Sequence, residues 1–220
     1  MFRIFRNLFK EKNEYDFRVV SRLKALVVEE KYNEVIDECC KILESTETEK
    51  HDQDLAKSLR GTFYILKKQH EEAMEDFRDL IDDDSADIKI RANALIKRAS
   101  LYIQQCKDPK EDPLKGTEIS HFDDNTKNYI CDFSSAMADF KKAEELDPEN
   151  ADIFHHRGQV NLLTEQIDAA TTDFEKAVTL NPDFPIAYVQ KLYTDYRHAM
   201  QKNDQVSNHC KVKKIENAII

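Results

Sequence analysis

ADIFHHRGQVNLLTEQIDAATTDFEKAVTLNP, residues 151–182, has the spacing of one helical hairpin. A small residue stands midway along the first arm, and the second arm carries alanine, phenylalanine and alanine at positions i, i+4 and i+7 before a proline. Those three positions share one helical face, and antiparallel helices pack closely only where one side of the contact is small. The proline ends the second arm because it cannot continue a helix. The frame residues are Gly158, Ala170, Phe174, Ala177 and Pro182.

The same spacing occurs twice more upstream. One copy is uninterrupted, whereas in the other the second arm comes 25 residues late. The added segment, residues 107–129, contains prolines, a glycine and many charges, so we expect an exposed loop at the hairpin turn. A hairpin repeated about every 34 residues resembles the tetratricopeptide repeat (TPR). The upstream frame residues are Gly61, Ala73 and Phe77, then Ala99, Ala136, Phe140 and Ala143.

The frame predicts an all-α chain, a TPR-type α-solenoid of about four to five antiparallel hairpins with the last one truncated. A degenerate repeat precedes the clear ones, and residues 211–220, KVKKIENAII, are interpreted as part of the last second arm. Residues 1–13 alternate phenylalanine, leucine and isoleucine with basic residues, which favours a capping helix over a membrane-surface or mitochondrial-targeting segment. The solenoid is expected over 14–220, with hairpins near 14–46, 51–84, 86–148, 150–182 and 184–220.

Composition supports helices and argues against several classes of function. The 220 residues include only 3 Gly and 5 Pro, too few turn formers for a many-stranded sheet. A net charge of -10 argues against general binding of nucleic acid, which needs clustered Lys and Arg. No apolar run is long enough to span a membrane, so this sequence alone reads as soluble. Five cysteines without a CxxC pair favour free thiols in a reducing compartment.

No catalytic, cofactor or metal site is predicted. The pattern contains no glycine-rich phosphate loop and no nucleophile motif. His155 and His156 are neighbours on a helix and point about 100° apart, so packing or lining a groove is favoured over metal binding. The acidic run at 82–84 is interpreted as a helix end. Three arginines that each precede a small frame residue, Arg60, Arg98 and Arg157, are assigned to packing and ion pairs between helices.

A peptide-binding groove is the predicted functional surface. In stacked hairpins the first helix of each pair lines the concave side, and fixed offsets from the small residue follow one face. Large apolar residues alternate there with hydrogen-bonding ones, which suits an amphipathic or extended peptide, and an acidic rim would attract basic ones. Burial of several of these side chains between hairpins is the alternative at each position. The predicted groove residues are Leu55, Ile65, Asn93, Ile96, Ile103, His155, Gln159, Leu162, Val189, Tyr193 and Tyr196.

Two phrases go beyond the TPR frame. KIRANALIKR at 89–98 and ADIFHHRGQ at 151–159 resemble the central repeats of the seventy-kilodalton import receptors of the mitochondrial outer-membrane translocase, the TOM complex. The resemblance covers about residues 15–200. It implies a protein import receptor on the cytosolic face of the mitochondrial outer membrane, without catalysis. Its implied partners are mitochondrial preproteins bound in the groove and other translocase subunits.

Departures from that family leave other functions open. The resemblance places this chain after the family's membrane anchor and chaperone clamp, so no clamp residue carries over, although chaperones stay on the list of partners. The insertion at 107–129 also departs from the family pattern. The alternatives are a cytosolic TPR co-chaperone or scaffold that binds a chaperone C-terminal peptide, and a truncated regulatory form of the receptor.

Overall fold

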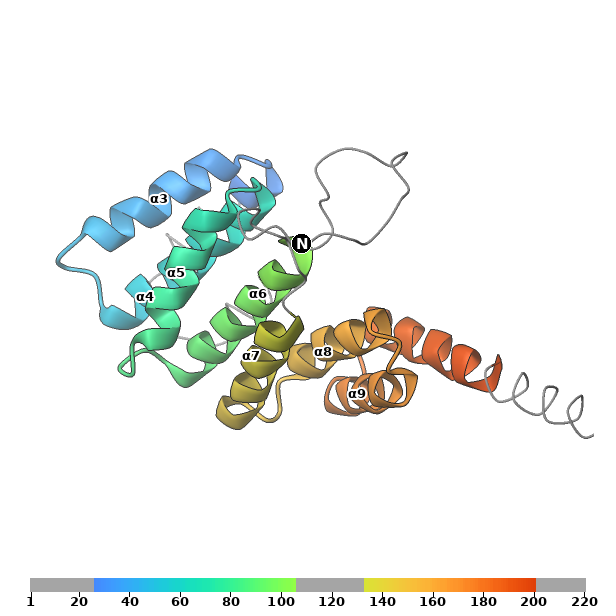
Figure 1. Ribbon diagram of the computed structural model, residues 1–220. Coiled ribbons are helices and arrows are strands. Elements are labelled where there is room, and N and C mark those ends of the chain that lie inside the picture. Colours follow the sequence, from blue (N-terminus) through green and yellow to red (C-terminus); the bar gives the residue numbers. More distant parts are fainter. Residues whose placement is uncertain (1–25, 106–132, 201–220) are drawn as a thin grey trace, which may run out of the picture. The chain divides into compact units, whose positions relative to one another are not determined.

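The structure is a computed structural model that describes residues 26–105 and 133–200 (Figure 1). The described residues form helices and turns and contain no strand, which confirms the all-α prediction. The chain divides into two compact units, residues 1–147 and 148–220, and each is described by itself. Three expected features lie outside the described residues: the segment 1–13, the insertion 107–129 and the arm at 211–220.

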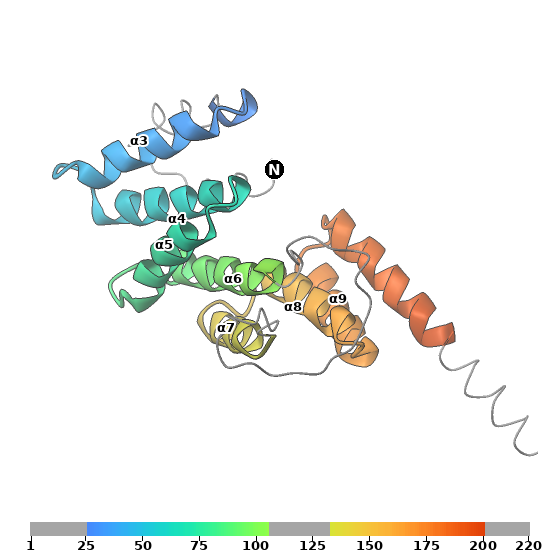
Figure 2. The same ribbon diagram turned by 45° about the horizontal axis from the view of Figure 1, so that its top comes forward.

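The first unit consists of helices packed in chain order. α4 and α5 form one antiparallel hairpin, and α6 and α7 form the next. α3 packs on α4, and α5 and α4 both contact α6, so the first arms of successive hairpins are neighbours (Figure 2). The helices are α3 (Tyr32–Glu44), α4 (Lys50–Leu66), α5 (His70–Asp82), α6 (Ile88–Gln105) and α7 (Phe133–Leu146).

The second unit contains the hairpin of α8 (Ala151–Leu163) and α9 (Ile167–Leu180), followed by a helix over residues 185–200. The Asn150 side chain caps α8 by accepting a hydrogen bond from the backbone N–H of Asp152 at 3.1 Å. α9 ends at Leu180, and the exposed Pro182 lies in the turn that follows. No helix among residues 26–105 and 133–200 is both long and apolar enough to cross a membrane.

The frame residues form the contact between the two arms of each hairpin. A Cβ atom on Gly158 would lie 2.8 Å from Cε1 of Phe174, and one on Gly61 would lie 2.8 Å from Cε1 of Phe77. The phenylalanine ring therefore fills the space that the missing side chain leaves. The frame residues that are completely buried are Ala73, Phe77, Ala99, Ala136, Phe140, Ala143, Ala170, Phe174 and Ala177.

The turns share a backbone conformation that the sequence pattern did not reveal. Lys68 and Glu165 have φ angles of 61° and 60°, in the left-handed region, and each follows its hairpin's glycine by seven residues. Glu30, in the turn before α3, has φ 57°. Glycine adopts this conformation without steric penalty, yet none of these turns contains one. The packed arms therefore impose the turn geometry on ordinary residues.

Candidate peptide-binding surface

One buried ion pair joins the arms of each described hairpin. Arg60 on α4 donates to Asp76 on α5, with 2.6 Å from Nη2 to Oδ1 and 3.0 Å from Nε to Oδ2. In the next hairpin, Arg98 reaches Asp139 at 2.7 and 2.8 Å. The hydrogen bonds that the two guanidinium groups donate to these carboxylates raise the pKa of both arginines. The packing role predicted for the arginines is therefore confirmed in these two hairpins.

The third hairpin has the same pair with an additional donor. Arg157 on α8 binds Asp173 on α9, and Asn161 donates to the same carboxylate at 2.8 Å. The carboxylate partners were not singled out from the sequence. A signal was present, because an Asp-Phe dipeptide recurs at 76–77, 139–140 and 173–174, directly before the buried ring. These pairs fix the rotation of the first arms, whose outer faces carry the predicted groove.

In the first unit, the predicted groove is only partly accessible. Leu55 and Ile65 on α4, and Asn93 and Ile103 on α6, are half-buried. Ile96 is 3% exposed, so it belongs to the core and offers no free surface to a ligand. α6 packs against α7, α5 and α4, and these neighbours leave little of its surface free.

In the second unit, His155 is also a core residue. It is 6% exposed, and its ring lies against Phe184 and Phe174 with centroid distances of 4.7 and 6.2 Å. His155 therefore packs in the core and does not line a free groove, which is the alternative left open at that position. Gln159 and Leu162 are half-buried, and Gln159 Oε1 lies 3.2 Å from Nδ1 of His156.

The helix over 185–200 carries the most exposed part of the predicted surface. Val189, Tyr193 and Tyr196 are 62%, 50% and 61% exposed. They recur at the three- and four-residue spacing that places side chains on one helical face. Ile186, three residues before Val189, is exposed too. Large exposed side chains outside the predicted set are Tyr188, Leu192 and Met200.

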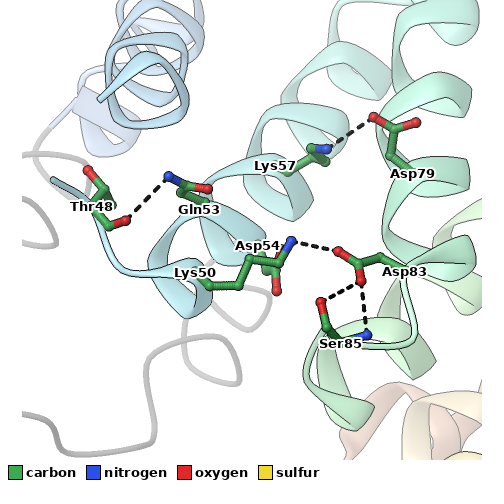
Figure 3. Close-up of polar contacts among 8 residues, drawn as sticks. All are labelled: Thr48, Lys50, Gln53, Asp54, Lys57, Asp79, Asp83 and Ser85. Atoms are coloured by element: carbon green, nitrogen blue, oxygen red, sulfur yellow. Dashed lines mark hydrogen bonds and ion pairs between the residues drawn. The ribbon is translucent and has the colours of Figure 1, made fainter. Parts of the chain in front are cut away.

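The acidic run at 82–84 is a helix end, as predicted. α5 stops at Asp82, and Asp83 accepts hydrogen bonds from Lys50 Nζ at 2.6 Å and from the Ser85 hydroxyl at 2.6 Å (Figure 3). Lys50 and the Ser85 donors lower the pKa of the Asp83 carboxyl. Asp84 pairs with Arg91 at 2.8 Å. In the part of the chain that the structure describes, no three His, Cys, Asp or Glu side chains are grouped as a metal site.

Cys39 and Cys40 are neighbours on α3 and differ in burial. Cys39 is completely buried, and burial raises the pKa of its thiol to about 12. Cys40 is partly exposed and accepts a hydrogen bond from Arg60 Nη1 at 3.4 Å. Both are free thiols.

Comparison with known proteins agrees with the fold. Residues 151–184 match the tetratricopeptide repeat family. The chain is 33% identical over 198 residues to the mitochondrial import receptor subunit TOM70 of Homo sapiens, and 32% identical over 200 residues to that of Rattus norvegicus. Each match covers 90% of this chain and 28% of the relative, so the chain spans less than a third of their length.

A solved structure supports the architecture alone. The first TPR of Spaghetti (RPAP3), bound to the HSP90 peptide SRMEEVD, superimposes with a TM-score of 0.50 at 17% identity, covering 68% of this chain and 95% of that one. That likeness concerns the fold and carries no ligand over to this chain. Together, residues 151–184 match the tetratricopeptide repeat, the described residues form helical hairpins, and the chain is similar to a part of the import receptor subunit TOM70.

Proposed function

We propose that this chain is a preprotein-binding module of the mitochondrial import machinery, acting by recognition of a peptide and without covalent chemistry. The proposal places it at the cytosolic face of the mitochondrial outer membrane, with other translocase subunits as further partners. The observation that carries it is the exposed stripe of Val189, Tyr193 and Tyr196. The stripe belongs to a chain of which 90% aligns with a part of TOM70.

The chemistry of the stripe suits an amphipathic segment. Two tyrosines supply apolar ring faces together with hydroxyl groups that can exchange hydrogen bonds with a peptide, and Val189 adds aliphatic surface. Aromatic side chains contribute much of the binding energy at peptide and protein interfaces. The net charge of -10 favours a peptide whose polar face is basic.

Binding of a synthetic basic amphipathic peptide, measured by fluorescence anisotropy, tests the proposal. Tyr193→Ser should weaken binding by roughly tenfold, because losing an interface aromatic costs at least about 1 kcal/mol. Tyr188→Ser is the matched control. Tyr188 is 51% exposed, close to the 50% of Tyr193, but it lies five residues earlier and therefore about 140° away around the helix.

Three results would contradict the proposal. The peptide could fail to bind, both tyrosine variants could lose affinity equally, or a scrambled peptide of the same composition could bind as tightly. Far-UV circular dichroism of each variant excludes loss of helix as the cause. Tighter binding of an acidic peptide with a free C-terminal carboxylate would instead favour a co-chaperone or scaffold, for which the predicted groove contributes the amide side chain of Asn93.

A further inference from the structure

The exposed stripe on the helix over 185–200 continues at both of its ends. Ile186 is 58% exposed and Met200 is 46% exposed. Together with the stripe, they follow one another at intervals of three, four, three and four positions. This alternation is the spacing by which one helix packs along its length against a second helix. The five residues are called the seam and are Ile186, Val189, Tyr193, Tyr196 and Met200.

The seam lies away from the side by which this helix packs in its own unit. Ala187 and Thr194 are two turns apart and completely buried. The centre of the seam lies about 130° around the helix from them. An ion pair attaches the helix to α9, with 3.4 Å from Nζ of Lys191 to Oε1 of Glu175. The helix is therefore held from one side, and the seam is presented on another.

The backbone of the helix restricts what can lie along the seam. A helix bonds its own N–H and C=O groups internally, so it offers no main-chain partner to a neighbouring segment. An extended peptide placed there would lose water from its backbone polar groups without gaining partners, which is unfavourable. Only two seam side chains, those of Tyr193 and Tyr196, carry a hydroxyl group. A helical ligand avoids this cost because its backbone is already hydrogen-bonded.

The spacing of the seam residues favours a helical ligand as well. They span about 21 Å along the helix axis, at about 5 Å from one to the next. Side chains on one face of an extended strand recur about every 6.7 Å, so an extended ligand is about 3 Å out of register after two intervals. Apolar residues at intervals of three and four on a second helix recur every 5 Å or so and stay in register over the whole seam.

We propose that the seam binds its peptide as an amphipathic α-helix of about four turns, laid along the helix over 185–200 with apolar residues at intervals of three and four. The inference rests on the proposed function and specifies the conformation of the peptide that this surface recognises. Charge favours a basic polar face on the ligand, because residues 148–200 contain eight Asp and Glu against four Lys and Arg. One of these cations, Lys191, already pairs with Asp195 at 2.8 Å.

Two peptides of identical composition distinguish a helical ligand from an extended one. Each contains only leucine, lysine and glutamine and is about sixteen residues long, enough for four turns of helix. One carries its leucines at alternating intervals of three and four residues, and the other carries them at every second residue. In fluorescence anisotropy with the full chain, the first peptide should bind at least about tenfold more tightly. A proline in place of a central glutamine should remove that advantage, because it breaks the helix.

Ile186→Ser tests whether the bound helix reaches the end of the seam. It should weaken binding of the first peptide by roughly fivefold, as expected for partial burial of an isoleucine side chain. Ile88→Ser is the matched control and should leave the affinity unchanged. Ile88 is 55% exposed, close to the 58% of Ile186, but it lies on α6 in the first unit.

Several results would overturn the proposal. Equal affinities of the two peptides, both weakened by Tyr193→Ser, would leave the proposed function standing and exclude the helical ligand. An affinity for the first peptide that Ile186→Ser does not change would exclude alignment along the seam. Failure of both peptides to bind would overturn the proposed function and this inference together. Self-association of the chain that Ile186→Ser abolishes, measured by sedimentation, would assign the seam to a second copy instead.

Discussion

Arg157 on α8 holds Asp173 on α9 through a fork of hydrogen bonds: Nη2 donates to Oδ1 at 2.7 Å, and Nε donates to Oδ2 at 3.0 Å and to Oδ1 at 3.2 Å. The Asp173 side chain is 7% exposed, and Asn161 donates to it as well. Such a fork is rigid and geometrically specific, so it fixes how one arm is rotated against the other. Arg157 directly precedes Gly158 on α8, and Asp173 directly precedes Phe174 on α9. The ion pair therefore lies next to the steric contact between Gly158 and Phe174.

Asp173→Ala should lower the free energy of unfolding by roughly 3 kcal/mol, because it leaves a partly buried guanidinium without its counter-charge. Urea denaturation followed by circular dichroism measures the change. Lys41→Ala, which removes an exposed partner of Glu38, is the control and should cost less than about 1 kcal/mol. Equal losses in the two variants would contradict a special role for the buried pair. Replacing both partners, as in Arg157→Met with Asp173→Leu, should restore part of the lost stability.

Gly158→Ala should destabilise the second unit even though alanine is the better helix former. The new methyl group would lie 2.8 Å from the Phe174 ring, and overpacking of this kind costs roughly 1 to 3 kcal/mol. Alanine favours the helix over glycine by roughly 1 kcal/mol, so the expected loss of stability is the overpacking cost minus this gain. Combining it with Phe174→Leu should cost less than the sum of the two single variants, as measured by a double-mutant cycle. Strict additivity would show that the two residues do not compete for one space.

Glu165→Gly should leave the hairpin as stable or make it more stable, whereas Glu165→Val should destabilise it. Glu165 has φ 60°, and this conformation costs a residue with a Cβ atom roughly 1 to 2 kcal/mol. Glycine avoids that cost but loses more chain entropy on folding, whereas a β-branched valine is penalised further. Thermal unfolding midpoints of the two variants provide the measurement, and a valine variant at least as stable as wild type would be inconsistent with the turn geometry.

Acid should weaken the link between α4 and α5 at Asp83. The Lys50 ammonium and the Ser85 donors lower the pKa of this carboxyl in the folded state. A lowered folded pKa means that the stabilisation is present above the unfolded value of about 4 and is lost as the pH falls below it. The difference in urea midpoint between wild type and Asp83→Asn should therefore shrink from about pH 6 to about pH 3. A difference that stays constant with pH would show that the charge of Asp83 does not contribute.

The helical repeat could be predicted from residue spacing alone. Glycine or alanine at the small position, and phenylalanine sixteen residues after each glycine, specify which faces of two helices can approach, and this depends only on side-chain size and helical periodicity. The spacing therefore located the arms around Gly61 and Gly158, and also the displaced arm at Ala136, Phe140 and Ala143. The aspartates of the ion pairs also recur at a fixed position, directly before the buried phenylalanine. Aligning the repeats by sequence would have identified them.

Accessibility of the predicted groove residues, by contrast, followed only from the packing of the helices. Ile96 and Val189 were both predicted to line the groove, but Ile96 is 3% exposed while Val189 is 62% exposed. Helical periodicity gives the direction of a side chain around its own axis and says nothing about which neighbouring helix lies there. Burial depends on contacts between residues far apart in the chain, so the candidate site emerged only when the helices were packed.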